Sequence, residues 1–216
     1  MQDFLRSLSP RVEFIVVIGG AFGPFILASV VQALVQPKLD TSDHELRSLL
    51  TYEVILLVVL GTFLHIRGWT TSLLGLDLHP RDFLLGAVLA VAVYAVEFAG
   101  SLIAQLIFPL KKPPTLVYPS ITVLNFLVAS VINPIFEEVF VCGYVVSALQ
   151  KSRGPWAAIN VSTAIRLLCH LYQGAFGVLS IVPTGLIFAY WFARTRRLWP
   201  PIVAHGLLNF IELLLV

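Results

Sequence analysis

Long apolar runs separated by short polar segments dominate this chain. A membrane-spanning helix needs about 20 mostly apolar residues, and seven segments approach or exceed that length. They are Phe14–Val35, Leu49–Ile66, Phe83–Phe108, Ile121–Leu149, Pro155–His170, Phe176–Phe192 and Leu198–Val216. The pattern predicts an all-α fold, a polytopic membrane bundle of about seven transmembrane helices, with a range of six to eight. Pro134 removes one hydrogen bond from the fourth helix and predicts a kink there.

The composition supports a membrane location. Of 216 residues, 58% are hydrophobic and 12% are charged, whereas a soluble domain typically carries about 25% charged residues. We expect residues 1–216 to form a single integral membrane domain in the lipid bilayer. The net charge of +2 gives no basis for a nucleic-acid partner. Both cysteines, Cys142 and Cys169, lie inside apolar segments, so no secreted disulfide framework is indicated.

The distribution of Lys and Arg between the loops predicts an orientation, because cytoplasmic loops are enriched in these residues. Nine basic residues fall on one side: Arg6, Arg11, Arg67, Arg81, Lys151, Arg153, Arg194, Arg196 and Arg197. Four fall on the other: Lys38, Arg47, Lys111 and Lys112. This asymmetry predicts a cytoplasmic N-terminus and an outer C-terminus.

Two adjacent acids, Glu137 and Glu138, interrupt the fourth apolar segment. Between Ile121 and Leu149, they are the only ionisable groups apart from the Cys142 thiol and the Tyr144 phenol. A carboxyl group at such depth in lipid is costly and marks a functional site by default. The pair is therefore the first candidate for chemistry.

Few other polar residues lie in the apolar segments. The ones that we weigh as partners are Glu97, Asn125, Asn133, Arg166, His170, His205, Asn209 and Glu212. His205 and Asn209 are four residues apart and share one helix face. Asn133 precedes Glu137 by one turn, and Cys142 follows Glu138 by one turn. We expect Glu97 to pair with another helix, and Glu53 and Glu212, near the ends of their spans, to face headgroups or water.

The depths of these groups are compatible with one cavity. At 1.5 Å per residue, Glu138, His170, His205 and Asn209 lie about 10–22 Å from the cytoplasmic ends of their helices. We therefore expect a site that opens toward the cytoplasm.

A buried glutamate, two imidazoles and a carboxamide suit hydrolysis of a carbonyl compound. A carboxylate can act as general base on water, and imidazole or carboxamide N–H groups can stabilise an oxyanion. The preferred mechanism requires no cofactor. A divalent metal such as zinc, held by Glu137, His170 and His205, is an alternative, although no HExxH is present.

Three short motifs resemble those of the CAAX protease and bacteriocin-processing family. Asn133-Pro-Ile-Phe-Glu-Glu-Val-Phe-Val-Cys-Gly143 is similar to its EExxxR motif with the following glycine. His170 and the segment His205-Gly-Leu-Leu-Asn209 resemble its FxxxH and HxxxN motifs. The resemblance covers a protease-like core at about 120–210 and implies a helical intramembrane endopeptidase related to type II CAAX prenyl proteases. It implies that Glu137 activates water with His170, beside Glu138, and that His205 and Asn209 stabilise the oxyanion.

Two positions depart from the family pattern. Cys142 stands in place of the motif arginine, and Arg166 in place of the motif phenylalanine. Without a cation, Glu138 would be unpaired. We hypothesise that Arg166 replaces the missing cation from a different helix and pairs with Glu138 or Glu97.

Three classes of function remain open from the sequence. The leading one is cleavage of a peptide bond in a membrane-associated protein or peptide. The second is a catalytically degenerate relative that acts as a membrane scaffold or immunity factor, as the two departures suggest. The third, a proton-coupled transporter, lacks the internal symmetry expected of many transporters. The short chain resembles bacterial members of the family, which predicts a bacterial cell membrane.

Overall fold

The computed structural model describes residues 2–35, 42–107 and 121–215, apart from the side chains of residues 175, 176 and 212–215. These residues are helical almost throughout, and the described ranges contain no strand. The elements are α1 (Gln2–Ser7), α2 (Pro10–Val35), α3 (Asp43–Ile66), α4 (Arg81–Ile107), α5 (Val123–Glu137), η1 (Glu138–Tyr144), α6 (Val145–Arg153), α7 (Pro155–Cys169), η2 (Leu171–Gln173), α8 (Gly174–Thr195) and α9 (Trp199–Leu215).

The all-α polytopic bundle predicted from the apolar pattern is confirmed. Each of the seven predicted segments is helical in the described residues except for one or two residues at an end, namely Ile121, Thr122, His170 and Leu198. Phe108 and Val216, at two of the predicted ends, lie outside the described residues. Five described helical stretches are long and apolar enough to cross a membrane: α2, α3, α4, the run Val123–Arg153 and Gly177–Thr195. The other two predicted spans are α7 and α9, of 15 and 17 residues. At 1.5 Å per residue, these two helices are shorter than the roughly 30 Å hydrocarbon core.

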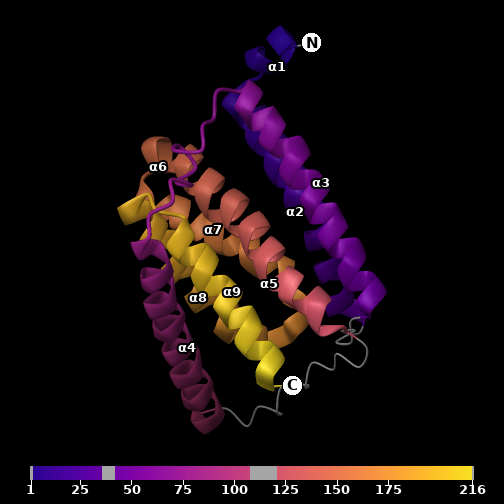
Figure 1. Cartoon of the computed structure of the whole chain (residues 1–216), viewed down its shortest axis with the longest axis vertical. Helices are drawn as coiled ribbons and strands as arrows, with labels where there is room; N and C mark the ends of the chain where they lie inside the picture. The colour runs from indigo at the N-terminus through magenta and orange to yellow at the C-terminus, as the bar shows by residue number, and fades with distance from the viewer. Residues whose placement is uncertain (1, 36–41, 108–120, 216) are drawn as a thin grey trace.

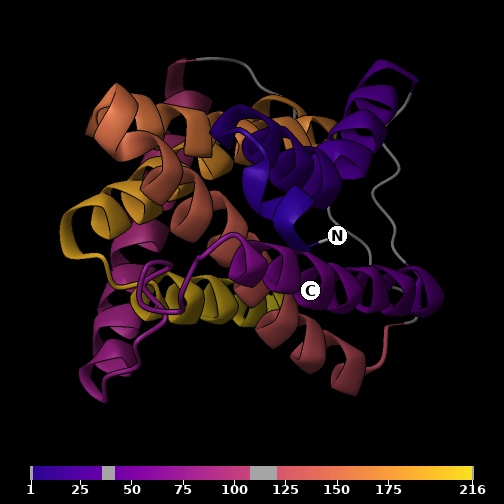
Figure 2. The same ribbon diagram turned by 90° about the horizontal axis from the view of Figure 1, so that it is seen from above.

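The helices that carry the motifs form the middle of the bundle (Figure 1). Viewed along the long axis, α2 and α3 lie on one side and α4 on the other (Figure 2). Helix α4 packs on α8 and α9, α3 packs on α5, and α2 packs on α7. The N-terminal half of the chain therefore flanks the motif-bearing helices on both sides.

Most of the basic residues gather at one end of the bundle, as their distribution in the sequence predicts. Arg67 donates to Glu13 and to backbone carbonyls of α1, whereas Arg197 pairs with the buried Asp82. Arg196 donates to Leu73 O. Arg67 thus joins the end of α3 to α1, and Arg197 joins the end of α8 to the start of α4. Helices α3 and α5 begin at the opposite end of the bundle (Figure 1). Lys38, Lys111 and Lys112 lie outside the described residues.

The fourth predicted span departs from α-helical geometry at the glutamates. The α-helix continues through Pro134 to Glu137 and passes into a π-helix over Glu138–Tyr144. The kink predicted at Pro134 stays a prediction, and the change of hydrogen-bonding pattern at Glu138 was not predicted. Hydropathy contains no signal for such a change, because the apolar character of the segment is unaltered.

Candidate active site

The two adjacent glutamates lie at the junction of α5 and η1. Glu137 is the last residue of α5, and Glu138 is the first of the seven-residue π-helix. π-helical turns are rare and occur frequently at functional sites. The side chain of Glu138 is fully buried, whereas that of Glu137 is 13% exposed. Glu137 is thus the more accessible carboxylate of the pair.

Arg166 on α7 pairs with both glutamates. Its Nη1 donates to Glu137 Oε2 at 3.0 Å, and its Nη2 donates to Glu138 Oε1 at 2.6 Å. The guanidinium is nearly inaccessible and lies 5.7 Å from the centre of the Phe188 ring. The pairing predicted between Arg166 and Glu138 is therefore confirmed. Glu97, the other predicted partner, instead accepts a hydrogen bond from Thr184 of α8.

Contacts one turn before Arg166 fix α7 against the π-helix. Ser162 Oγ donates to the Val141 carbonyl at 2.8 Å and lies 4.0 Å from the Cys142 sulfur. Cys142 is completely buried. A side chain much longer than cysteine at position 142 would have to displace α7. Cys142 and Arg166 therefore complement each other, because the small residue allows the approach that brings the cation to Glu138.

His205 reaches Glu138 from α9. Its Nδ1 donates to Glu138 Oε1 at 2.8 Å, and its side chain is 12% exposed. The next residue, Gly206, explains how α9 approaches so closely. A Cβ atom at Gly206 would lie 2.6 Å from the Ser130 carbonyl oxygen of α5, closer than such contacts occur in proteins. The glycine thus lets the two helices meet beside the glutamates.

His170 caps the C-terminus of α7. Its Nδ1 bonds to the Arg166 carbonyl at 2.8 Å, one of the last-turn carbonyls that lack a partner within the helix. Because a carbonyl can only accept, the proton resides on Nδ1 and leaves Nε2 as the free nitrogen. His170 interacts electrostatically with Glu137 and His205. Arg166 therefore holds the glutamates with its side chain and orients His170 with its backbone.

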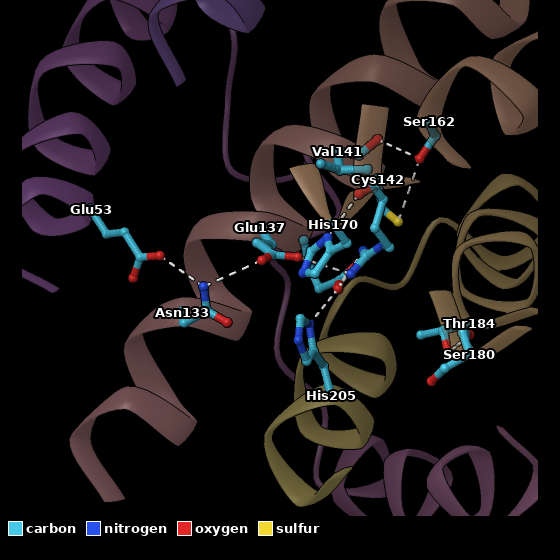
Figure 3. A network of polar contacts seen from close by, with 12 residues as sticks. Glu53, Asn133, Glu137, Val141, Cys142, Ser162, His170, Ser180, Thr184 and His205 are labelled. Atoms are coloured by element: carbon cyan, nitrogen blue, oxygen red, sulfur yellow. Dashed lines mark hydrogen bonds and ion pairs between the residues drawn. The ribbon is translucent and has the colours of Figure 1, made fainter. Parts of the chain in front are cut away.

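Asn133 connects Glu137 to an acid that the sequence interpretation placed wrongly. Its Nδ2 donates to Glu137 Oε1 at 3.3 Å and to Glu53 Oε1 at 2.7 Å (Figure 3). Glu53 was expected to face headgroups or water, but only 1% of it is exposed. It shares the buried face of α3 with Leu46, Leu50, Leu60 and Leu64. This helical periodicity is the sequence signal that could have assigned Glu53 to the interior.

Two predicted residues lie at the margin of this cluster. Glu97 bonds to Thr184, as expected for an interhelical partner, and interacts electrostatically with His205. Asn209 follows His205 by one turn of α9 and is half-buried, and its catalytic role stays a prediction. The side chain of Glu212 lies outside the described residues.

Comparison with known proteins matches the part of the chain that carries the motifs. Residues 119–211 match the family model described as type II CAAX prenyl endopeptidase Rce1-like. An 86-residue stretch is 31% identical to a Bacillus subtilis (strain 168) protein with the printed name "Putative membrane peptidase YdiL", covering 40% of this chain and 34% of the relative. The resemblance to the CAAX protease and bacteriocin-processing family is therefore confirmed.

The match with the CAAX protease family covers part of this chain. This chain spans about a third of the length of the relative that it matches. No solved structure shows a significant match. The segment matched by the family model contains Glu137, Glu138, His170, His205 and Asn209, whereas Glu53 and Glu97 lie outside it.

The geometry around the glutamates changes the expected set of metal ligands. In the described part of the chain, Glu137, Glu138 and His205 are the three residues with possible ligand atoms within 4.8 Å of one another. His170, which the sequence suggested instead of Glu138, is not in that group. The Arg166 guanidinium occupies Glu137 Oε2 and Glu138 Oε1, where a divalent cation would meet its positive charge. An ion bound by these three residues would lie close to the guanidinium, and the like charges would repel each other.

Proposed function

We propose that this protein is an intramembrane endopeptidase that hydrolyses a peptide bond of a membrane-associated protein or peptide. The observation that carries the proposal is the unequal environment of the two glutamates. Glu138 is fully buried between Arg166 and His205, whereas Glu137 keeps part of its surface accessible. Glu137 is therefore available for proton transfer, whereas Glu138 holds Arg166 and His205 in place electrostatically.

Water attack is the first step of the proposed reaction. Glu137 removes a proton from a water molecule, and the resulting hydroxide adds to the carbonyl carbon of the scissile bond. The free Nε2 of His170 accepts a hydrogen bond from the same water and helps to orient it. The product is a tetrahedral intermediate with negative charge on the former carbonyl oxygen.

Residues of α9 stabilise this oxyanion in the proposed reaction. In the proposed step, His205 carries a proton on each ring nitrogen, so that it can donate two hydrogen bonds at once. In that form, Nδ1–H donates to Glu138 while Nε2–H donates to the oxyanion, and the Asn209 amide adds a second donor. The carbon–nitrogen bond then breaks, and the leaving nitrogen takes the proton held by Glu137.

The proposed mechanism uses no metal ion. Arg166 already supplies the positive charge that compensates Glu137 and Glu138. Activation of water is assigned to the carboxylate of Glu137 rather than to a Lewis acid.

For cellular placement, we propose a bacterial cell membrane with the N-terminus in the cytoplasm and the site open toward that side. The gathering of basic residues at one end of the bundle supports this orientation. A protease-accessibility map of terminal tags in oriented membrane vesicles tests it, and external exposure of an N-terminal tag would reverse it.

The decisive experiment on the proposed function compares membrane proteomes of cells that express the wild type or Glu137→Gln. We expect peptide fragments that are present with the wild type and absent with the variant at equal protein levels. A biological output that survives Glu137→Gln, with no fragment lost, would instead support a non-catalytic scaffold.

A further inference from the structure

Glu53 of α3 is a buried acid outside the segment that matches the CAAX protease family. It lies on the apolar face of its helix together with Leu50 and Leu60, where a carboxyl group is expensive. A leucine at this position would continue the buried face without that cost. The acid therefore calls for an explanation in terms of its contacts.

Glu53 is connected through Asn133 to Glu137, the proposed base. Asn133 Nδ2 donates to Glu53 Oε1 at 2.7 Å, and the same nitrogen lies 3.3 Å from Glu137 Oε1 (Figure 3). The other oxygen, Glu53 Oε2, is buried and has no hydrogen-bond partner among the described residues. The bond to Asn133 is thus the polar contact that holds this side chain.

The two sides of the Asn133 carboxamide differ, so its orientation between Glu53 and Glu137 matters. An amide has a donor side, the NH₂ group, and an acceptor side, the carbonyl oxygen. If Asn133 turned over, its Oδ1 would face Glu137 Oε1, and two acceptors would repel each other. The shorter bond to Glu53 keeps the NH₂ group on the side of both carboxyl groups. Glu53 thereby determines which face of Asn133 meets Glu137.

We infer that Glu53 is a positioning residue of the active site: through Asn133, it fixes the orientation of the Glu137 carboxylate. This inference rests on the proposed role of Glu137 as base. It also means that the N-terminal half of the chain contributes to a site whose predicted catalytic residues all lie in the C-terminal half.

The first test measures the hydrogen bonding of the Glu137 carboxylate without any substrate. Infrared spectra of the purified protein in lipid nanodiscs are recorded for each variant with and without Glu137→Gln, and the difference isolates the Glu137 carboxylate band. We expect Glu53→Leu and Asn133→Ala to shift this band. Glu53→Gln, whose carbonyl still accepts from Asn133, leaves it in place.

The second test uses cleavage of the substrate found by the proteomic comparison. Loss of one hydrogen bond to a charged group corresponds to about a 10- to 100-fold change in rate. We expect Glu53→Leu and Asn133→Ala to lower kcat by that factor with little change in KM, and their combination to be no worse than either alone. Glu53→Gln should keep kcat near the wild-type value.

Thr51→Val is the matched control, since Thr51 lies on the exposed side of α3, two residues from Glu53. It should change neither the band nor kcat. An unshifted Glu137 band in Glu53→Leu overturns the inference, as does a Glu53→Gln variant as impaired as Glu53→Leu. If the wild type cleaves nothing, the proposed function fails, while the infrared result still decides the role of Glu53.

Discussion

Arg166 and Glu138 form an ion pair of 2.6 Å between two different helices, α7 and η1, with both side chains almost completely buried. The family motif that the sequence resembles has its arginine on the same helix as the glutamates. Here, Cys142 occupies that position and packs against Ser162. The positive charge is therefore retained at the acids although its place in the chain has changed.

Arg166→Phe should destabilise the protein strongly. Removing one partner of a buried ion pair leaves an uncompensated charge and typically costs about 3–5 kcal/mol. We expect a lower midpoint of thermal unfolding in detergent and no detectable cleavage. An Arg166→Phe protein as stable as the wild type would show that the pair is dispensable.

Moving the cation back to η1 gives a reciprocal test. Cys142→Arg alone should be destabilising, because the buried Cys142 is in contact with α7. Combined with Arg166→Phe, which vacates the space beside Glu138, the same change should be far less harmful. The measurement is a double-mutant cycle of unfolding midpoints, and additive effects of the two substitutions would contradict the exchange.

The two glutamates should respond differently to neutralisation. Glu137→Gln should lower the cleavage rate about 10²- to 10⁴-fold, the usual contribution of a general base, and should lower stability less than Glu138→Gln. Glu138→Gln removes the charged partner of both Arg166 and His205. Parallel measurements of cleavage and unfolding would separate the roles. A Glu137→Gln enzyme that stays active would assign the base elsewhere.

Gly206→Ala should separate α9 from α5. The added Cβ would lie 2.6 Å from the Ser130 carbonyl oxygen, and overpacking of this kind typically costs about 1–3 kcal/mol. We expect slower cleavage, because His205 moves with its helix, and a lower unfolding midpoint. Gly100→Ala on α4 is the control, since a Cβ there meets nothing within 4 Å. Equal behaviour of the two variants would argue against close packing at Gly206.

Cleavage should persist after chelation of metal ions. Arg166 pairs with one oxygen of each glutamate and already supplies a positive charge beside both carboxylates. We expect purified protein to contain less than stoichiometric zinc by mass spectrometry and to keep its activity in 1,10-phenanthroline. Stoichiometric zinc together with activity that is lost on chelation and restored by zinc would refute the metal-free mechanism.

Much of this architecture could be predicted from the sequence, because hydropathy and spacing report directly on helices. The apolar segments predicted the helical bundle. The few polar residues within them indicated the glutamate pair, His205 and Arg166 as site residues. The partner of Arg166 had to be left open between Glu138 and Glu97, since distances between helices are not encoded in the spacing of residues along one helix.

Two features of the structure were not predicted, the π-helix and the buried position of Glu53. The π-helix at Glu138–Tyr144 changes the hydrogen bonds of the backbone but not the apolar character of its residues. Glu53 was judged by its nearness to the end of a span rather than by the helix face that it occupies. The depth of a residue in the membrane and the helix face on which it lies are independent of each other. The contact between Glu53 and Asn133 depends on the helix face.

The placement of Arg166 on α7 has a consequence for membrane insertion. An arginine or a carboxylate entering the bilayer on a lone helix costs about 2.5–3.5 kcal/mol at the helix centre. The acids end α5 and begin η1, and α7 follows α6 after a single linking residue, Gly154. The helical run from α5 to α6 and the following helix α7 can therefore enter the lipid together as a hairpin. The ion pair between Arg166 and the glutamates would then already be formed. We therefore expect the charges of the site to be neutralised as these helices insert into the membrane.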